Sequence, residues 1–146
     1  MLPFKPLSAK LQALLNGGLN DIVKSLVVLE QDFAIDLNQG QLNEGQNIDK
    51  SDIIPEYSRT TISIKKSKNQ ISDRVTLRDT GDFYKSFKLK AENDSFSISA
   101  TDSKTNKLQK KYGTKILGLS EESKAIFARH GLKIQLMKLI KQKIVQ

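Results

Sequence analysis

The hydrophobic pattern of the first third of the chain is that of an amphipathic helix. From Leu19 to Phe33, apolar residues recur mostly at spacings of three and four, with acidic and basic residues on the remaining positions. Asn20 or Asp21 is expected to cap this core helix. The helix is expected to continue beyond Phe33 and to end near Gly45.

Both ends of the chain predict further helices. A short apolar repeat predicts a helix that is capped by Ser8 and ends at the glycines 17–18. In the last quarter of the chain, Ser120 can cap a long helix, and the two acidic residues after it suit the positive end of the helix dipole. The expected kink of this helix is Gly131, and His130 is expected to be a surface or kink residue rather than a catalytic one. Its largely helical apolar stripe consists of Ile126, Leu132, Leu136, Leu139, Ile140 and Ile144.

Apolar and polar residues alternate on either side of a short polar turn in the middle of the chain. Residues 87–91 and 95–100 each place their apolar side chains on one face by the strand period of two, and the polar residues 92–94 join them. This pattern predicts an antiparallel hairpin, with its lysines and serines pointing outward.

A second alternating run predicts a further strand. Residues 59–65 are rich in β-branched side chains and place Ile62 and Ile64 on one face, which is expected to be buried. The polar residues 65–70 are expected to form a mobile loop. Residues 43–58 have neither a helical nor a strand period and are predicted to form a longer loop.

The remaining pieces complete the expected fold. A short helix over residues 102–111 is expected to end at Gly113, after which Ile116, Leu117 and Leu119 dock on the core. The fold class is α+β, with N-terminal helices and a long C-terminal helix against a small, mostly antiparallel sheet built from the Ile62 strand and the hairpin. One domain over residues 1–146 is expected, with a helical part (1–42), a loop (43–58), a sheet with hairpin (59–103) and a basic helical part (104–146).

The stretch from Thr76 to Lys88 holds the most specific local signals. Val75 and Leu77 mark a brief extended piece, after which Asp79 or Thr80 can cap a short helix; Gly81 completes the turn, and Asp82 suits the positive end of the dipole. Three aromatic residues follow, of which the first and third share a helical face and are expected to clamp the turn to the sheet. A buried structural corner is favoured over a ligand site. These aromatic residues are Phe83, Tyr84 and Phe87.

The positive charge of the chain is concentrated at its C-terminal end. The formal net charge is +8; residues 1–100 hold 13 Lys and Arg against 13 Asp and Glu, whereas residues 101–146 hold 11 against 3. Such a segment can be a solvated helix face, can meet an acidic protein partner or can follow nucleic-acid phosphates. The candidate surface consists of Lys133, Lys138, Lys141 and Lys143.

Motifs for catalysis or metal binding are weak. The chain has no cysteine and one histidine, so a thiolate nucleophile and a histidine pair for zinc are excluded. Asp79 and Asp82 with Glu92 or Asp102 could assemble a nuclease-type magnesium site, but such carboxylate pairs are common in capping turns. The cluster of Glu44, Asp49, Asp52 and Glu56 lacks the alternation of a calcium loop. We expect no cofactor, no metal and no enzymatic activity.

The sequence also bears on location. No apolar run approaches the roughly 20 residues that span a bilayer, and the first residues lack a long apolar core and a small-residue cleavage site. We therefore expect a soluble, non-exported protein with no membrane partner.

Two passages resemble proteins of tailed-phage assembly. Leu77-Arg78-Asp79-Thr80-Gly81, followed by a short aromatic turn and a hairpin, resembles the Leu-x-Asp-Thr-Gly-x-Leu element of tail-completion and head–tail joining proteins. Residues 112–114 and 116–122 (Tyr-Gly-Thr and Ile-Leu-Gly-Leu-Ser-Glu-Glu) resemble the Phe-Leu-Gly-Leu-Ser-x-Glu-Asp passage of the related virion-morphogenesis proteins. The order of elements in that group is also similar.

This resemblance implies an architectural protein of the virion, assembled in the host bacterial cytoplasm. It implies a homomeric ring at the head–tail connector, the neck or the tail end, in contact with portal, adaptor or tail proteins. The basic C-terminal part could then face packaged DNA, the channel or an acidic surface of the adjoining ring. Asp79, Thr80 and Gly81 then form the turn, and Gly118, Leu119 and Ser120 the start of the last helix. The alternative is a small nucleic-acid-binding protein that uses residues 104–143 as its phosphate surface.

Overall fold

Helices dominate the structure, with one β-hairpin among them. The computed structural model describes residues 18–145, with side chains up to residue 142, so the helix expected after Ser8 and the side chain of Lys143 lie outside the described part. The α+β class is confirmed. In chain order, the elements are α2 (Leu19–Leu29), α3 (Gln31–Asn43), α4 (Arg59–Ser67), α5 (Asp82–Lys85), β1 (Phe87–Ala91), β2 (Phe96–Ala100), α6 (Thr105–Tyr112), the 3₁₀ turn η1 (Thr114–Ile116), α7 (Glu121–Ile126), the π-helical segment η2 (Phe127–Leu132) and α8 (Lys133–Val145).

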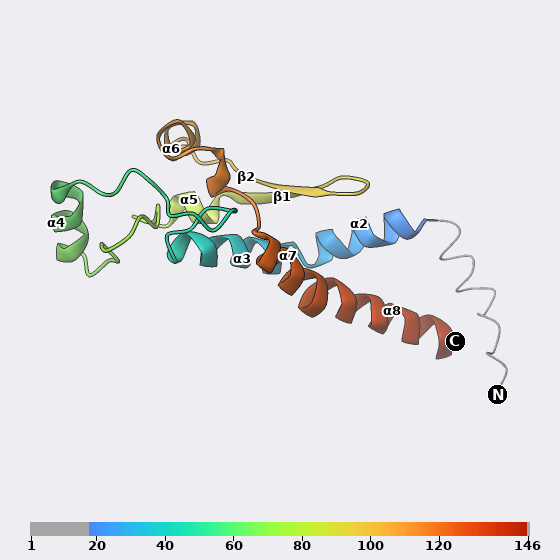
Figure 1. Ribbon diagram of the computed structural model, residues 1–146. Coiled ribbons are helices and arrows are strands. Elements are labelled where there is room, and N and C mark those ends of the chain that lie inside the picture. Colours follow the sequence, from blue (N-terminus) through green and yellow to red (C-terminus); the bar gives the residue numbers. More distant parts are fainter. Residues whose placement is uncertain (1–17, 146) are drawn as a thin grey trace.

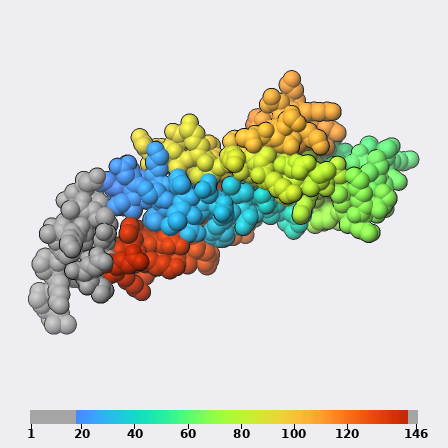
Figure 2. Space-filling view, turned by 180° about the vertical axis from the view of Figure 1, so that it is seen from behind, coloured from blue at the N-terminus to red at the C-terminus, as the bar shows by residue number. Residues whose placement is uncertain are grey.

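Helix α3 lies at the centre of an elongated molecule. The hairpin and α6 lie on one side of it and the α7–α8 helix on the other, while α4 and its loop form one end (Figure 1). Helices α2 and α8 and the tip of the hairpin form the opposite end, and the space-filling view shows the same order from behind (Figure 2). Strand β1 packs against both α2 and α3, and η2 packs against α3.

The predicted hairpin is confirmed. Its register pairs Phe87 with Ala100, Leu89 with Ile98 and Ala91 with Phe96, so the apolar residues of both strands share one face. The sheet has two strands only within the described residues. The sheet is therefore smaller than predicted, because it lacks the expected Ile62 strand.

The predicted strand over residues 59–65 is wrong, because this segment is helix α4. The side chain of Ser58 accepts a hydrogen bond from the backbone N–H of Thr61 (3.2 Å) and so caps a helix that continues to Ser67. Ile64 is 50% exposed and Lys65 is buried, the reverse of the strand prediction. The polar loop expected over residues 65–70 accordingly starts only after Ser67.

The predicted 43–58 loop is confirmed between α3 and α4, where an isolated bridge pairs Gln46 with Asp52. Val75 and Leu77 are buried, but they do not form a strand. Leu77 has a φ of 57°, a left-handed conformation that interrupts extended backbone.

The long N-terminal helix exists but is interrupted. It starts directly after Gly18, so neither Asn20 nor Asp21 is its cap, and the backbone departs from helical angles at Glu30 (φ −97°, ψ 17°). The N–H of Glu30 still donates to the carbonyl of Leu26, and α3 then runs to Asn43. A hydrogen bond from Gln135 to the Glu30 carboxylate (2.7 Å) fixes this junction to α8.

The C-terminal helix bends through the π-helical segment η2, which contains the predicted kink residue Gly131. A Cβ atom at Gly131 would lie 3.2 Å from a ring carbon of Phe33 and 3.3 Å from one of Phe127, so a larger residue here would have to displace these rings by a few tenths of an ångström. His130 is exposed, as expected. The described members of the apolar stripe are all half-buried: Ile126, Leu132, Leu136, Leu139 and Ile140.

One hydrophobic cluster joins these elements. Phe127 is 1% exposed, and its ring centroid lies 6.0 Å from that of Phe33 and 5.5 Å from that of Phe96, so it connects α3, the hairpin and η2. The predicted docking of Ile116 and Leu119 on the core is confirmed, with Leu117 packed at its edge; helix α6 followed by Gly113 matches the prediction too. No helix within residues 18–145 has the length and apolar character to cross a bilayer.

Candidate functional site

The turn at residues 79–81 is built by Thr80 rather than by Asp79. The Thr80 hydroxyl donates to the Asp82 carboxylate (2.7 Å) and accepts from the Asp82 backbone N–H (3.3 Å). Gly81 precedes α5 with a φ of 90°, a conformation that strains any other residue. Asp79 instead forms an ion pair with Lys68, the residue that directly follows α4 (2.9 Å). The turn therefore couples α4 to the start of α5.

The three predicted aromatic residues are buried together behind this turn. The rings of Phe83 and Phe87 meet edge to face with centroids 5.0 Å apart, and Tyr84 lies 5.8 Å from Phe87. Because α5 ends at Lys85, the Phe83–Phe87 contact bridges a helix and a strand rather than one helical face, so that part of the prediction is wrong. The buried structural corner itself is confirmed.

Tyr84 holds the segment before the turn. Its hydroxyl donates to the carbonyl of Thr76 (2.6 Å), and burial raises the pKa of Tyr84 above its ordinary value, against the opposing charge of Arg78. Tyr57 binds the same segment: its hydroxyl accepts hydrogen bonds from the backbone N–H groups of Thr76 and Leu77, both at 3.0 Å. Two tyrosines thus fix the backbone that leads into the turn.

The raised pKa of Tyr84 predicts that the protein loses stability at alkaline pH. The unfolded chain ionises Tyr84 above about pH 10 while the folded chain does not, so the free energy of unfolding falls as the pH rises through and beyond 10. Tyr84→Phe should remove this part of the fall and cost about 1–2 kcal/mol at neutral pH, because the Thr76 carbonyl loses its donor. Urea unfolding at pH 7 and pH 10.5 measures both effects. An unchanged alkaline slope in the variant would contradict this role.

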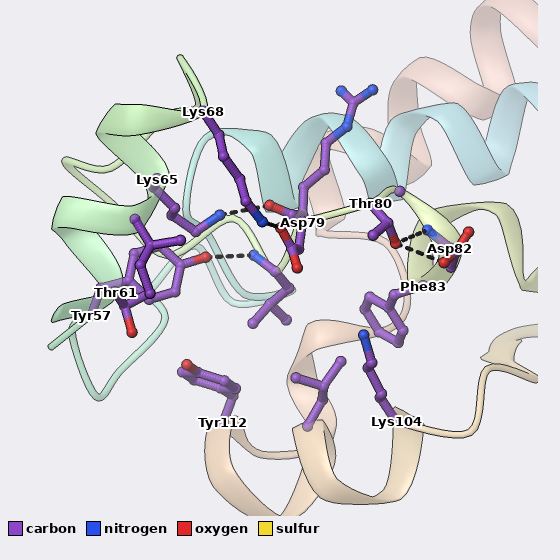
Figure 3. A pocket seen from close by; sticks show the side chains of 15 residues that line it. Tyr57, Thr61, Lys65, Lys68, Asp79, Thr80, Asp82, Phe83, Lys104 and Tyr112 are labelled. Carbon is purple, nitrogen blue, oxygen red and sulfur yellow. Dashed lines mark hydrogen bonds and ion pairs between the residues drawn. The ribbon is translucent and has the colours of Figure 1, made fainter.

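A cavity of about 300 Å³ lies between the turn, α4 and α6 (Figure 3). Its apolar lining includes Leu77, Phe83 and Leu108, and lysines and carboxylates surround this lining. Among them, Lys65 is 6% exposed, donates to the Arg78 carbonyl (2.6 Å) and lies over the Tyr57 ring (5.0 Å). The cavity therefore joins an apolar floor to a mixed-charge rim, which suits one or two apolar side chains.

The ion pair between Asp79 and Lys68 at the rim predicts a small loss of stability at acid pH. The Lys68 ammonium holds the pKa of Asp79 below its usual range, so the pair stabilises the fold above about pH 4 and this stabilisation is lost as the pH falls below that value. Asp79→Asn should lower stability by less than about 1 kcal/mol at pH 7, because both partners are solvent-exposed. Thermal unfolding between pH 2.5 and 7 should show a smaller difference between variant and wild type at the acid end. A difference that grows toward low pH would refute the assignment.

Helix α3 connects the two passages on which the family resemblance rests. Asn38 is fully buried; its amide nitrogen donates to the carbonyl of Ile116 (3.1 Å), and its amide oxygen accepts from the N–H of Gly118 (2.9 Å). Gln41 repeats the pattern one turn later, donating to the carbonyl of Gly118 (3.0 Å) and accepting from the N–H of Ser120 (2.8 Å). On the neighbouring face, Gln39 donates to the carbonyl of Tyr84 (3.1 Å).

Sequence reasoning missed these three amides. Their signal is the occurrence of polar side chains at positions 38 and 41, which share the core-facing side of a helix. The predicted start of the last helix is confirmed: Leu119 is buried, and the Ser120 hydroxyl accepts from the Ser123 N–H (3.1 Å).

The lysines of the alternative phosphate surface over residues 104–143 lie on two sides of the molecule. Lys133, Lys138 and Lys141 are exposed on α8, whereas the lysines of α6 lie on the opposite side of α3 (Figures 1 and 2). The lysines of residues 104–143 therefore do not form one surface.

Several of the carboxylates weighed as metal ligands have protein partners: Asp79 pairs with Lys68, and Asp82 accepts from the Thr80 hydroxyl. Lys115 donates to Asp49 (2.7 Å), and this bond together with those from Ser51 holds the pKa of Asp49 well below its usual range. Within residues 18–145, no group of three or more His, Asp or Glu side chains is arranged to hold a metal ion.

A comparison of the chain with protein-family models, with curated proteins and with solved structures found no match. The assignment of function therefore depends on the residues and contacts described above.

Proposed function

We propose that this chain is a structural protein of a tailed-phage or prophage virion, one subunit of a homomeric ring at the head–tail connector, the neck or the tail end. Its partners are further copies of itself and the adjoining portal, adaptor or tail proteins, and it assembles in the host bacterial cytoplasm.

The observation that carries the proposal is the convergence of the two motif passages on α3. Asn38 and Gln41 hold the passage that leads to Ser120, and Gln39 holds the aromatic corner behind the Asp79–Gly81 turn. The contacts of both passages with α3 thus fix their backbone and position the helices that follow. This use supports an architectural role for the motif residues.

A second line of support is the exposed apolar surface, since ring subunits need contact surfaces. Large apolar side chains are exposed on helices and on the loop before α4, at both ends of the molecule, which is unfavourable for a chain without partners. They include Leu19, Val23, Val28, Leu29, Ile54, Ile64, Ile134 and Met137. The alternative of a nucleic-acid-binding protein has less support, because the lysines of residues 104–143 are divided between two sides of the molecule.

Mass spectrometry of density-purified particles tests the proposal. We expect the chain at a fixed multiple of the portal or tail-tube protein, with several copies per particle, as a closed ring requires. If the chain is absent from particles and abundant in the lysate, the proposal fails. Binding to duplex DNA that weakens steeply with salt would then favour the alternative.

Neutralising the basic C-terminal helix gives a second prediction. Replacement of Lys133, Lys138, Lys141 and Lys143 by glutamine should leave the fold intact, because the described members of this set are exposed and form no ion pair within residues 18–142. Particle yield and infectivity should fall, because the helix loses its charge toward DNA or an acidic protein surface. Replacement of Lys88 and Lys90 by glutamine, on the outward face of the hairpin, is the matched control. Unchanged infectivity would refute a role for this helix in assembly.

A further inference from the structure

Two faces of this chain have complementary charge and are both exposed. Helices α2 and α3 hold three acidic residues and one basic residue, and Glu30 lies between them, whereas α8 holds four lysines and no acidic residue. Faces of opposite charge attract each other and can steer one copy of the chain onto another.

The basic face is on α8. Its exposed residues, at spacings of three to five, cover one side of the helix, while Gln135, Leu136, Leu139 and Ile140 lie half-buried on the other side. The exposed side has an apolar centre with lysines around it, a composition typical of an interface core and its rim. It consists of Ile134 (43% exposed), Met137 (48% exposed), Lys133, Lys138 and Lys141, which we call the α8 face.

The acidic face is on α2 and α3. Val28 and Leu29 are 47% and 66% exposed, and Asp32 and Asp36 follow on the same side at helical spacing. The side stays continuous across the break because Glu30 keeps its hydrogen bonds to Leu26 and Ala34. The face ends at the exposed Gly40, where a Cβ would meet nothing within 4 Å. We call Val28, Leu29, Asp32, Asp36 and Gly40 the α3 face.

Neither face is satisfied within the chain. Among residues 18–142, Asp32, Asp36 and the three lysines of the α8 face form no ion pair. At the helical rise, the α8 face from residue 133 to 141 is about 12 Å long and the α3 face from residue 28 to 40 is about 18 Å long, so the α8 face fits within the length of the α3 face.

We propose that the α8 face of one subunit docks on the α3 face of the next copy, with Ile134 and Met137 against Val28 and Leu29 and the lysines toward Asp32 and Asp36. The contact joins different patches of identical subunits, so it repeats head to tail and closes into a ring when the rotation permits. This inference rests on the proposed ring and identifies its subunit interface.

Disulfide trapping tests the interface in the purified full chain. Because the chain has no cysteine, Asp36→Cys and Lys138→Cys each introduce one thiol, and any disulfide joins two molecules. We expect the mixture of the two variants to yield a mixed dimer at least about fivefold more abundant than either single-variant dimer under mild oxidation at low salt. Lys88→Cys, at an exposed position on the hairpin, replaces either variant as the control and should give only background dimer.

Charge reversal gives an independent readout by light scattering. Asp32→Lys with Asp36→Lys should weaken self-association, and so should Lys133→Glu with Lys138→Glu. All four changes in one chain should restore it, because the contact again pairs opposite charges. Circular dichroism and thermal unfolding verify that every variant is folded.

Three outcomes would overturn the interface: mixed dimer at the control level, excess of single-variant dimers, or failure of the fourfold variant to recover association. These outcomes are distinct from failure of the proposed function. If the chain is present in particles but the mixed disulfide does not form, the proposed interface is wrong and the proposed ring stands. If the disulfide forms but the chain is absent from particles, the interface stands and the virion assignment is wrong.

Discussion

Replacing Phe127 with alanine is expected to lower the free energy of unfolding by about 3–5 kcal/mol, the range found when a buried aromatic ring is removed. Phe127 is 1% exposed, and its ring contacts Phe33 of α3 and Phe96 of β2. The loss combines the burial of a large apolar side chain with the cavity left behind. Surrounding elements cannot close this cavity easily, because Gly131 already brings α3 and η2 into close contact.

Urea unfolding followed by circular dichroism measures the effect. Phe127→Leu keeps most of the volume and should cost clearly less, about 1–2 kcal/mol. Gln142→Ala is the surface control on the same long helix and should change stability by no more than about 0.5 kcal/mol. A loss below about 1.5 kcal/mol for Phe127→Ala would mean that this ring is not the junction of the three elements.

The hairpin could be predicted from the sequence because its information is local. Residues 87–91 and 96–100 alternate with period two, and a short polar turn separates them, so neighbouring residues determine both the pairing and the buried face. The start of the last helix at Ser120 was predictable for the same reason, since a capping hydroxyl and two acidic residues act within one turn.

Helix α4 could not be predicted from periodicity alone. Residues 60–64 alternate as a strand does, yet a strand is stable only beside a partner, and the hairpin pairs with itself. The local signal was Ser58, whose side chain caps the helix, and it outweighs the β propensity of the residues that follow. The burial of Lys65 is a consequence of the tertiary structure, because its acceptor, the Arg78 carbonyl, is 13 residues away.

The Asp79–Gly81 turn depends on local signals, whereas the amide contacts of α3 depend on the tertiary structure. Thr80 and Gly81 act on adjacent residues, so the turn was expected, although the ion pair of Asp79 with Lys68 required the position of α4. The partners of Asn38 and Gln41 are 77 to 80 residues away in sequence. Their positions on the core-facing side of α3 are a local signal of burial, but only the fold shows which backbone groups these amides bind.

The buried amide of Asn38 gives the second large prediction: Asn38→Ala is expected to lower the free energy of unfolding by about 2–4 kcal/mol, because each buried polar group left without a partner costs about 1–3 kcal/mol. Two such groups result, the carbonyl of Ile116 and the N–H of Gly118. Gln39→Ala is the matched control in the same helix. Its amide makes one partly buried hydrogen bond, to the carbonyl of Tyr84, so its loss should cost about 1 kcal/mol.

Hydrogen exchange shows where the Asn38→Ala loss acts. The N–H of Gly118 donates to Asn38, so its exchange should accelerate in the variant more than that of Lys90, which is opposite Ser97 at a hydrogen-bonded position of the hairpin. Uniform acceleration, or a cost no larger than that of Gln39→Ala, would contradict the role of Asn38 as the link between α3 and the last helix. If the link holds, the variant should also loosen the start of α7, because the Ser120 N–H depends on Gln41 one turn along the same helix. Helix α8, which bears the α8 face, continues from α7 through η2. Loosening of α7 in Asn38→Ala should therefore also weaken subunit association.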